Sequence, residues 1–128
     1  MATICNCGKI GVAKRIADID SAPAYTYMSV GGGTTTEAAT QTGLTTEMSA
    51  NGWDRVVATC TYEADYKTKW EGEFTNGIGF NVGLNELGIH NGSTPTAGDI
   101  LLRHVFASTI PVEDGGTAVF AVTITLAS

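Results

Sequence analysis

The fold is decided by residues 83–126, which read GLNELGIHNGSTPTAGDILLRHVFASTIPVEDGGTAVFAVTITL. In the final run, residues 118–126, apolar side chains occupy every second position: Phe120, Val122, Ile124 and Leu126. This period of two, in a run dominated by β-branched residues, predicts a strand. Residues 100–108 alternate in the same way, and Asp114-Gly115-Gly116 supplies a turn because glycine adopts positive φ at little cost. We therefore expect a hairpin of these two strands with a long loop over residues 109–116.

Further strands are expected before this stretch. They are residues 24–30, 55–63, 66–75, and 78–82 with 87–91, the last two being separate short strands or one bent strand. In residues 66–75 the charged side chains of Lys67, Lys69, Glu71 and Glu73 share one face, opposite Trp70 and Phe74. A strand with one charged and one apolar face is typical of antiparallel sheets.

The N-terminus is the one part of the chain with a helical pattern. Residues 1–8 resemble an irregular or strand-like lead-in, whereas residues 9–19 place Ile10, Ala13, Ile16 and Ala17 at helical spacing. The sequence therefore predicts an all-β fold, mainly an antiparallel β-sandwich of jelly-roll-like or Greek-key type, with one short N-terminal helix within about the first 20 residues. The length of 128 residues suits one domain, 1–128.

Composition excludes several classes of function. Charged residues make up only 16% of the chain, against about a quarter in average proteins. The net charge is −6 with seven basic residues, so a nucleic-acid partner is not expected, because phosphate binding needs clustered Lys and Arg. No apolar run is long enough to span a membrane. Asn6, Gly8 and Lys9 interrupt any signal-peptide core, so we expect synthesis in a cytoplasm without a secretion signal.

The three cysteines, Cys5, Cys7 and Cys60, predict neither a disulfide framework nor a metal centre. Their odd number argues against full pairing. The spacing of Cys5 and Cys7 is shorter than in structural zinc sites, which also need four ligands. We expect free thiols, with Cys60 buried in a strand, and no metal or cofactor.

No pattern in the chain is typical of an active site. Gly31-Gly32-Gly33 lacks the Gly-Lys-Ser/Thr of a phosphate loop and predicts a sharp turn. His90 lies near Glu86, and the two could form an acid–base pair across a bend. His104 lies on the apolar side of its strand, as a core or interface histidine does. No serine has the glycine pattern of a nucleophile elbow, so we predict no catalytic residue and no enzyme.

The remaining candidates are surfaces. Two polar segments are expected to be contact loops: the first loop, residues 31–48, and the second loop, residues 91–99. A merely solvated connection is the alternative for the first loop. Trp70 is expected in the core, and Trp53 is undecided. The candidate interface residues are Tyr25, Tyr27, Thr34, Thr35, Thr36, Leu44, Trp53, Asn91 and Thr94.

Several segments resemble, in order and spacing, a family of small tailed-bacteriophage virion proteins. They are Ala13-Lys14-Arg15-Ile16, Val30-Gly31-Gly32-Gly33-Thr34-Thr35, Ala38-Ala39 with Thr42-Gly43-Leu44-Thr45-Thr46-Glu47, Leu87-Gly88-Ile89-His90-Asn91, Ile100-Leu101-Leu102-Arg103-His104-Val105-Phe106, and a closing strand after Gly115-Gly116-Thr117. The resemblance covers most of residues 13–126. His90 and His104 depart from the pattern, because the family more commonly has apolar or aromatic residues there.

The resemblance implies a non-enzymatic structural protein of the virion. It would be a capsid decoration or cement protein that stabilises the assembled shell, or a tail, neck or fibre-base component. The first is preferred because the chain is short and has no fibre repeat or heptads. The implied partners are the major capsid protein or other virion proteins, and a homodimer or homotrimer is expected. An alternative of another class is a carbohydrate-binding β-sandwich, for which Trp53 with Asn51 and Asp54 is the candidate cluster.

Overall fold

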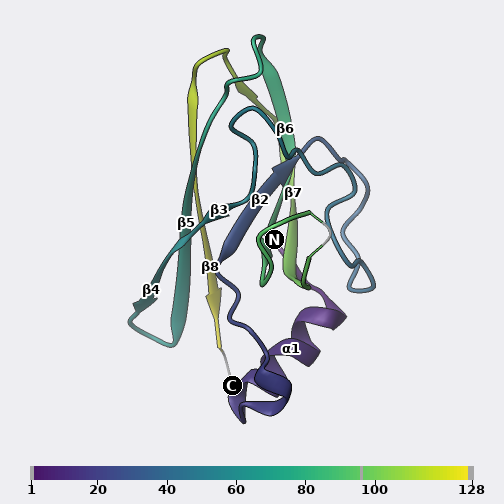
Figure 1. The fold of residues 1–128 in the computed structure, drawn as a ribbon, viewed down its shortest axis with the longest axis vertical. Coiled ribbons are helices and arrows are strands. Elements are labelled where there is room, and N and C mark those ends of the chain that lie inside the picture. The colour runs from purple at the N-terminus through teal and green to yellow at the C-terminus, as the bar shows by residue number, and fades with distance from the viewer. Residues whose placement is uncertain (1, 96, 127–128) are drawn as a thin grey trace.

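The computed structural model describes residues 2–95 and 97–126, which form two facing β-sheets with one helix at one end (Figure 1). The elements are β1 (Thr3–Ile4), α1 (Asn6–Ile16), a 3-10 turn (Ile19–Ser21), β2 (Tyr27–Gly31), β3 (Val56–Val57), β4 (Thr59–Glu63), β5 (Lys67–Thr75), β6 (Val82–His90), β7 (Ile100–Val112) and β8 (Thr117–Thr125). The larger sheet has the order β1-β7-β6-β2-β3, and the smaller sheet has the order β4-β5-β8. The strand pairings described are antiparallel, so the expected all-β sandwich with one short helix is confirmed.

The core lies between the sheets and follows the predicted alternation of β5. Trp70 and Phe74 point inward with 5% and 1% exposure, while Lys69 on the opposite face contacts Glu71 and Glu63. Trp70 is therefore a core residue, as expected. Its indole Nε1 donates a hydrogen bond to the Tyr25 carbonyl at 2.7 Å, which satisfies the only polar group of the side chain.

The predicted strand over residues 55–63 is two strands in different sheets. β3 pairs with β2 in the larger sheet, and β4 pairs with β5 in the smaller one. Between them Ala58 is buried, and its N–H donates to the Thr26 carbonyl at 2.7 Å. The chain thus changes sheet within one alternating run, as corner strands of sandwiches do. Cys60 on β4 is a free, exposed thiol and not the buried one that was expected.

The predicted hairpin of the last two strands is also wrong. β7 continues to Val112, so the predicted loop over residues 109–116 shrinks to the turn at residues 113–116. β7 pairs with β6, whereas β8 crosses to the smaller sheet and pairs with β5 along its whole length. Alternation along a strand defines its faces but not its neighbour, and the neighbour here is chosen by long-range pairing. The alternative of one bent strand holds for β6, although that strand spans Val82–His90 and has a register shift between Leu84 and Glu86.

The buried side chain of Asn76 holds this crossover in place. Its Nδ2 donates to the carbonyls of Phe80, Val112 and Glu113 at 2.9–3.1 Å. Its Oδ1 accepts from the Trp53 indole at 3.3 Å and from the Ile78 N–H at 3.1 Å. One amide side chain therefore connects the end of β5, the end of β7 and the buried tryptophan.

The helix lies earlier in the chain than predicted and faces the sheet differently. α1 begins at Asn6 and ends at Ile16, and its buried residues are Gly8 and Gly11. A Cβ at Gly8 would lie 2.6 Å from the Leu101 Cα, so the helix backbone rests directly on β7. As a result Ile10 and Ile16 remain 59% and 82% exposed. Close glycine packing is invisible to an apolar-periodicity argument, which explains the error.

Asn76→Ala should lower the free energy of unfolding by at least about 3 kcal/mol, because each buried backbone group left without a partner costs about 1–3 kcal/mol. Asn81→Ala is the matched control: Asn81 is exposed and accepts one hydrogen bond, from Asp114 N–H at 3.0 Å. The control should cost about 1 kcal/mol or less. Urea unfolding followed by Trp fluorescence measures both, and equal losses would contradict the role given to Asn76.

Candidate functional site

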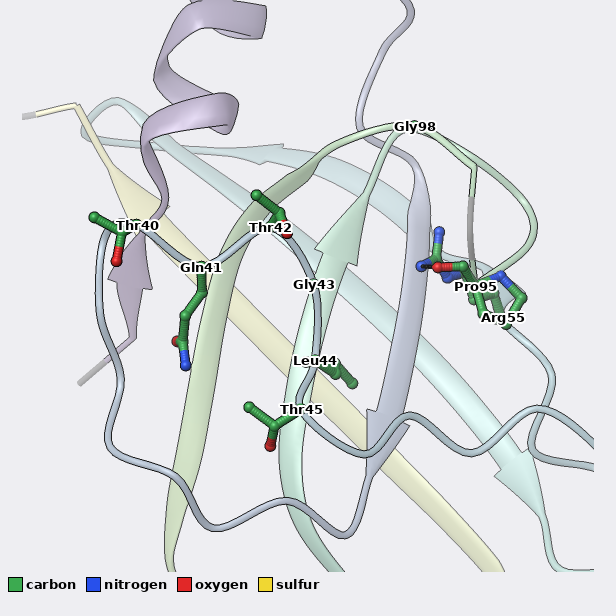
Figure 2. A pocket seen from close by; sticks show the side chains of 9 residues that line it. All are labelled: Thr40, Gln41, Thr42, Gly43, Leu44, Thr45, Arg55, Pro95 and Gly98. Atoms are coloured by element: carbon green, nitrogen blue, oxygen red, sulfur yellow. Dashed lines mark hydrogen bonds between the residues drawn. The ribbon is translucent and has the colours of Figure 1, made fainter.

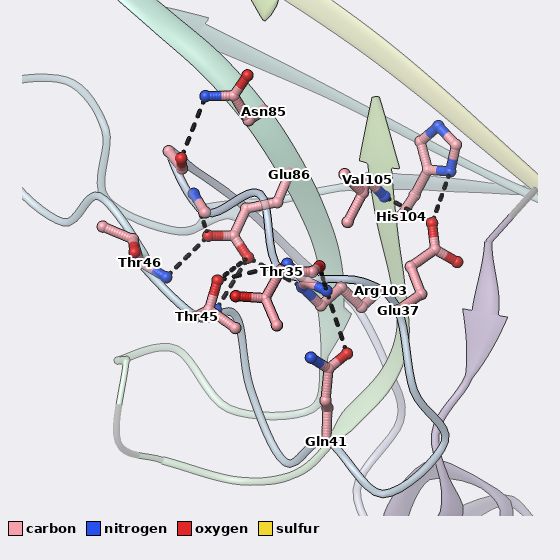
Figure 3. A network of polar contacts seen from close by, with 12 residues as sticks. Thr35, Glu37, Gln41, Thr45, Thr46, Asn85, Glu86, Arg103, His104 and Val105 are labelled. Carbon is pink, nitrogen blue, oxygen red and sulfur yellow. Dashed lines mark hydrogen bonds and ion pairs between the residues drawn. The ribbon is translucent and has the colours of Figure 1, made fainter. Parts of the chain in front are cut away.

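The first loop folds back over the outer face of the larger sheet and is fixed there by Glu86 of β6 (Figure 3). The Glu86 carboxylate is completely buried. It accepts hydrogen bonds from the backbone N–H groups of Gly33 at 2.7 Å, Thr45 at 2.9 Å and Thr46 at 2.8 Å. One carboxylate thus holds both ends of the first loop against the sheet.

Arg103 of β7 neutralises this buried carboxylate. Its Nε donates to Glu86 Oε1 at 3.0 Å, and its side chain is also completely buried. Its Nη1 donates to the Thr35 carbonyl at 2.7 Å and to Gln41 Oε1 at 3.1 Å, and its Nη2 donates to Thr45 Oγ1 at 3.3 Å. The guanidinium therefore connects the middle of the first loop to the same carboxylate that holds its ends.

Two residues of the glycine triplet, Gly31 and Gly33, allow the first loop to lie close to Glu86. A Cβ on Gly33 would overlap the Glu86 carboxylate and the Thr45 hydroxyl, and a Cβ on Gly31 would overlap the Thr46 carbonyl. A phosphate loop offers backbone N–H groups to an anion. Here the corresponding N–H groups of Gly33, Thr45 and Thr46 bind the protein's own carboxylate. Gly31 and Gly33 are therefore packing positions, whereas a Cβ on Gly32 would contact nothing. The predicted sharp turn is wrong, because β2 continues to Gly31 and none of the three glycines has a positive φ.

The environment of Glu86 keeps it ionised. Burial by itself raises the pKa of the carboxyl, but hydrogen bonds from Thr45 and Thr46, then Arg103 and Gly33, outweigh that effect and leave the pKa below its ordinary value. A carboxylate that accepts several backbone hydrogen bonds is stabilised in its charged form. The ion pair with Arg103 is thus complete at neutral pH.

A second arginine joins the first loop to the second loop. Arg55 Nε and Nη2 donate to the two carboxylate oxygens of Glu47 at 2.8 and 3.0 Å. Its Nη1 donates to the carbonyls of Gly92 at 2.9 Å and Ala97 at 3.2 Å, and its Nη2 donates to the Pro95 carbonyl at 3.2 Å. The side chain is only 2% exposed. The two segments predicted as contact loops are therefore adjacent and joined through the hydrogen bonds of one arginine; Thr96 within the second loop lies outside the described residues.

An open depression of about 610 Å³ separates the two loops (Figure 2). Its lining is polar and comes mainly from residues 40–45 of the first loop, with Arg55, Pro95 and Gly98 on the other side. Thr40 and Thr42 are exposed on its rim. We call the exposed side of residues 34–44, 91–95 and 97–99 the loop face.

Most of the predicted interface residues lie in or near the loop face, and two do not. Those that are exposed or half-buried are Tyr27, Thr34, Thr35, Thr36, Leu44, Asn91 and Thr94. Tyr25 is 8% exposed beneath α1, and burial raises the pKa of its hydroxyl to about 12. Trp53 is fully buried, stacks on Phe74 with ring centroids 6.0 Å apart and binds Asn76. Neither side chain is available to a partner, and the cluster of Trp53, Asn51 and Asp54 offers no aromatic platform for a sugar.

The acid–base pair of His90 and Glu86 that the sequence left possible does not form. His90 Nε2 lies 2.6 Å from Ser29 Oγ instead, and both residues are buried. Burial, and secondarily the positive charge of Arg55, lowers the pKa of His90 to about 3, so the ring is neutral. The His90 ring and a methyl group of Leu44 meet over Gly88, where an added Cβ would lie 2.8 Å from His90 Nε2 and 3.0 Å from Leu44 Cδ2. Ser29 and His90 are 0% and 1% exposed, and we assign this pair a structural role.

His104 packs edge-on against Phe106 with ring centroids 5.4 Å apart, on the apolar side where it was expected. Its Nδ1 lies 3.5 Å from Glu37 Oε2. The same carboxylate accepts hydrogen bonds from Thr3 Oγ1 and the Val105 N–H, each at 2.7 Å. Glu37 thus attaches the first loop to β1 and β7. Burial by itself raises the pKa of the Glu37 carboxyl, but the hydrogen bonds from Val105 and Thr3 outweigh that effect and leave the pKa below its ordinary value.

Sequence reasoning did not predict the roles of the four charged residues that build the site, which are Glu47, Arg55, Glu86 and Arg103. Of these, only Glu86 is a candidate functional group from the sequence, as a possible partner of His90. The sequence did contain a signal for Glu86 and Arg103. Glu86 is the only ionisable residue in the apolar run LNELGI, and Arg103 is the only one besides the histidine in LLRHVF. Charged residues are almost never fully buried unless paired, so two isolated opposite charges in buried strands indicate an ion pair. Nothing in the sequence indicated that Glu47 and Arg55 would face each other.

The comparisons with known proteins do not place the chain in a family. No protein-family model matches it, and no curated protein matches it significantly. In the part of the chain that the structure describes, no group of three or more His, Cys, Asp and Glu residues could hold a metal ion. Within the same residues, no helix is long and apolar enough to cross a membrane.

Arg103→Met should destabilise the protein by about 3–5 kcal/mol, because removing one partner of a buried ion pair leaves an uncompensated charge. The matched control is Arg15→Met, since Arg15 is exposed and donates one hydrogen bond to the Ala22 carbonyl. It should cost about 1 kcal/mol or less. Chemical denaturation measures both variants. A loss at Arg103 no larger than at Arg15 would mean that the buried pair does not fix the loop.

His90 should make stability fall with acidification below its ordinary pKa of 6.5. Between 6.5 and about 3 the unfolded chain binds a proton that the folded protein excludes, so the free energy of unfolding decreases as pH falls. Between about pH 7.5 and about pH 5.5 the decrease should be about 1.4 kcal/mol. His90→Gln should abolish it, whereas His104→Gln, which keeps His90, should not. Urea unfolding at the two pH values tests this, and a wild type with equal stability at both would refute it.

Proposed function

We propose that the protein is a non-enzymatic structural protein of a bacteriophage virion that binds other protein subunits through its loop face. The observation that carries the proposal is the coupling of the two loops by Arg55 and Glu47. A long solvated connection would not need two buried ion pairs to hold it. A surface that must present one shape to a partner would benefit from both.

Rigid loops favour binding for a thermodynamic reason. Ordering a loop on association costs free energy that subtracts from affinity, and pre-organisation removes that cost. The first loop is ordered in advance by Glu86 and Arg103, and the second by Arg55. The loop face is therefore suited to bind with little rearrangement.

The chemistry of the loop face fits another folded protein. Exposed threonines dominate residues 34–44, and the one charged residue there, Glu37, is engaged by Thr3 and Val105. Threonine offers a hydroxyl and a methyl group, which suit a protein surface with mixed polarity. A phosphate backbone would require cations, and both nearby arginines already bind carboxylates.

Within the virion we propose a decoration or cement role, with the major capsid protein as the partner. The resemblance of residues 13–126 to small virion proteins supports the class, and the compact single sandwich supports decoration over a fibre. A protein that binds the assembled shell and not its dissociated subunits stabilises the shell by mass action. A symmetric homo-oligomer would match the symmetry of a shell. A tail, neck or fibre-base location is the alternative within the same class.

Co-sedimentation with shells that lack the protein tests the proposal. Wild type should bind saturably and raise the melting temperature of the shells. Thr34→Asp with Thr36→Asp should weaken binding by at least about tenfold, since truncating or charging central contacts costs more than about 1.4 kcal/mol. Thr59→Asp with Thr61→Asp adds the same charge to exposed positions of β4, on the other sheet, and should bind as wild type.

Three results would redirect or reject the proposal. Binding to purified tails but not to shells would move the protein to the tail. Equal weakening by both double variants would reject the loop face as the contact surface. Binding to neither structure would reject the virion assignment.

A further inference from the structure

β8 forms a long sheet edge that no other described strand covers. It forms the outer strand of the smaller sheet, beside β5 (Figure 1). The edge strands β1, β3 and β4 are short, with two, two and five residues, whereas β8 has nine. The part of β7 beyond its pairing with β1 is also an edge, but it contains Pro111 and its Val105 N–H donates to Glu37. Natural proteins protect long edges with charges, proline or bulges. β8, with the sequence TAVFAVTIT, has none of these.

The pairing with β5 shows which backbone groups of β8 are available at its free edge. Leu126 N–H donates to the Tyr66 carbonyl at 2.9 Å, and the register is continuous from there to the start of the strand. Hydrogen-bonded and non-hydrogen-bonded pairs alternate in antiparallel sheets. The even-numbered residues of β8 therefore bond to β5, and the free edge carries the N–H and C=O groups of Thr117, Val119, Ala121, Thr123 and Thr125. Among the described residues no strand pairs with this edge.

The inner side of the same edge is incompletely covered. Phe120, Val122 and Ile124 point toward the core but remain half-buried. Phe120 stacks on Phe106, which is also half-buried, with ring centroids 5.5 Å apart. At the C-terminal end of β8 an apolar groove of about 580 Å³ lies between the strand and α1. The groove is lined by Ile4, Val12, Ile16, Leu101, Ile124 and Leu126, with Lys9 beside them.

We propose that two copies of the chain pair through their β8 strands, antiparallel and about a two-fold axis at Ala121. This register places Thr117 opposite Thr125, Val119 opposite Thr123 and Ala121 opposite itself. Each residue paired in this register is one whose N–H and C=O point to the free edge, so backbone hydrogen bonds can form along the whole strand. The smaller sheets of the two copies would join into one continuous sheet.

Side chains on both faces fit this register. On the inner face Phe120 lies opposite Val122 of the second copy, and Ala118 lies opposite Ile124, so large side chains meet smaller ones. On the outer face threonine and valine oppose each other, and such β-branched cross-strand pairs are favourable. No charge opposes a like charge, because β8 carries none.

Charge at the ends of the strand favours a second copy over an unrelated segment. The turn before β8 carries the exposed carboxylates of Glu113 and Asp114. In the antiparallel pair this acidic turn extends past Thr125 of the second copy, toward the groove that holds Lys9. The contact occurs twice, once at each end. A second β8 strand has the right length, the right alternation of available backbone groups and complementary charge at its ends. The best partner for this free edge is therefore a second copy of the chain.

This interface is separate from the loop face, so the inference does not depend on the proposed function. If both hold, each dimer presents two loop faces to a shell, and binding to both would raise the effective affinity without new contacts. Failure of one is distinguishable from failure of the other, because oligomeric state and shell binding are measured independently.

Light scattering after size exclusion tests the dimer with complementary charge variants of the full chain. Val119→Lys with Thr123→Lys places lysines directly opposite each other and should be monomeric, as should Val119→Glu with Thr123→Glu. An equimolar mixture of the two should form a heterodimer, because each lysine then opposes a glutamate. Thr59→Lys with Thr61→Lys on β4 adds the same charge and should remain dimeric. Circular dichroism checks that each variant is folded.

Cross-linking provides a second, register-specific readout. In the Cys60→Ser background, Ala121→Cys places two thiols across the two-fold axis, where paired Cα atoms are about 5.5 Å apart, within the span of a disulfide. Mild oxidation should give a covalent dimer, and Thr61→Cys in the same background should not. A monomeric wild type at its highest soluble concentration, a dimer indifferent to the charge pairs, or no cross-link at Ala121 would each overturn the inference. Pairing of β8 with a segment of a different protein, and not with itself, would also overturn it.

Discussion

The structure depends on one costly constraint, the burial of Glu86 and Arg103 on the outer face of the larger sheet. Removing two charges from water costs several kcal/mol per ion, and their attraction offsets this only if the remaining hydrogen-bonding groups are satisfied. The sheet alone cannot satisfy them. The first loop supplies the missing donors and acceptors through Gly33, Thr45 and Thr35. The ion pair can therefore be buried only when the first loop closes over it. Closure requires glycine at position 33, because a Cβ there would overlap the Glu86 carboxylate.

The same principle recurs where the chain changes sheet. Asn76 satisfies buried carbonyls at the crossover from β7 to β8, and Arg55 satisfies carbonyls of the second loop. In a chain with only 16% charged residues, a few buried polar side chains organise most of the long connections. Such groups stabilise one arrangement of a loop because any other arrangement leaves them unpaired. A small sandwich can thereby present defined loops without a disulfide or a metal among its described residues.

The two proposed surfaces arise from opposite physical situations. At the loop face the charged side chains of Glu37, Glu47 and Arg55 are paired within the protein, and exposed threonines, Ser93 and Asp99 surround an open depression. At the free edge of β8, by contrast, the outward N–H and C=O groups have no partner strand among the described residues, and Phe120 and Ile124 beside them remain half-buried. The first situation favours recognition of a pre-existing surface, and the second favours completion of a sheet.

The sequence predicts the fold class, the faces of β5 and β8 and the core position of Trp70, and it contains no recognisable catalytic motif. These follow from local patterns, because a period of two and the residue types within it are properties of a short segment. Long-range packing is what divides residues 55–63 between two sheets, keeps β7 and β8 from pairing, and buries Trp53. It also decided that α1 packs through its glycines. Each of these depends on hydrogen bonds or contacts between residues far apart in the chain, and no local pattern encodes which distant group will be the partner.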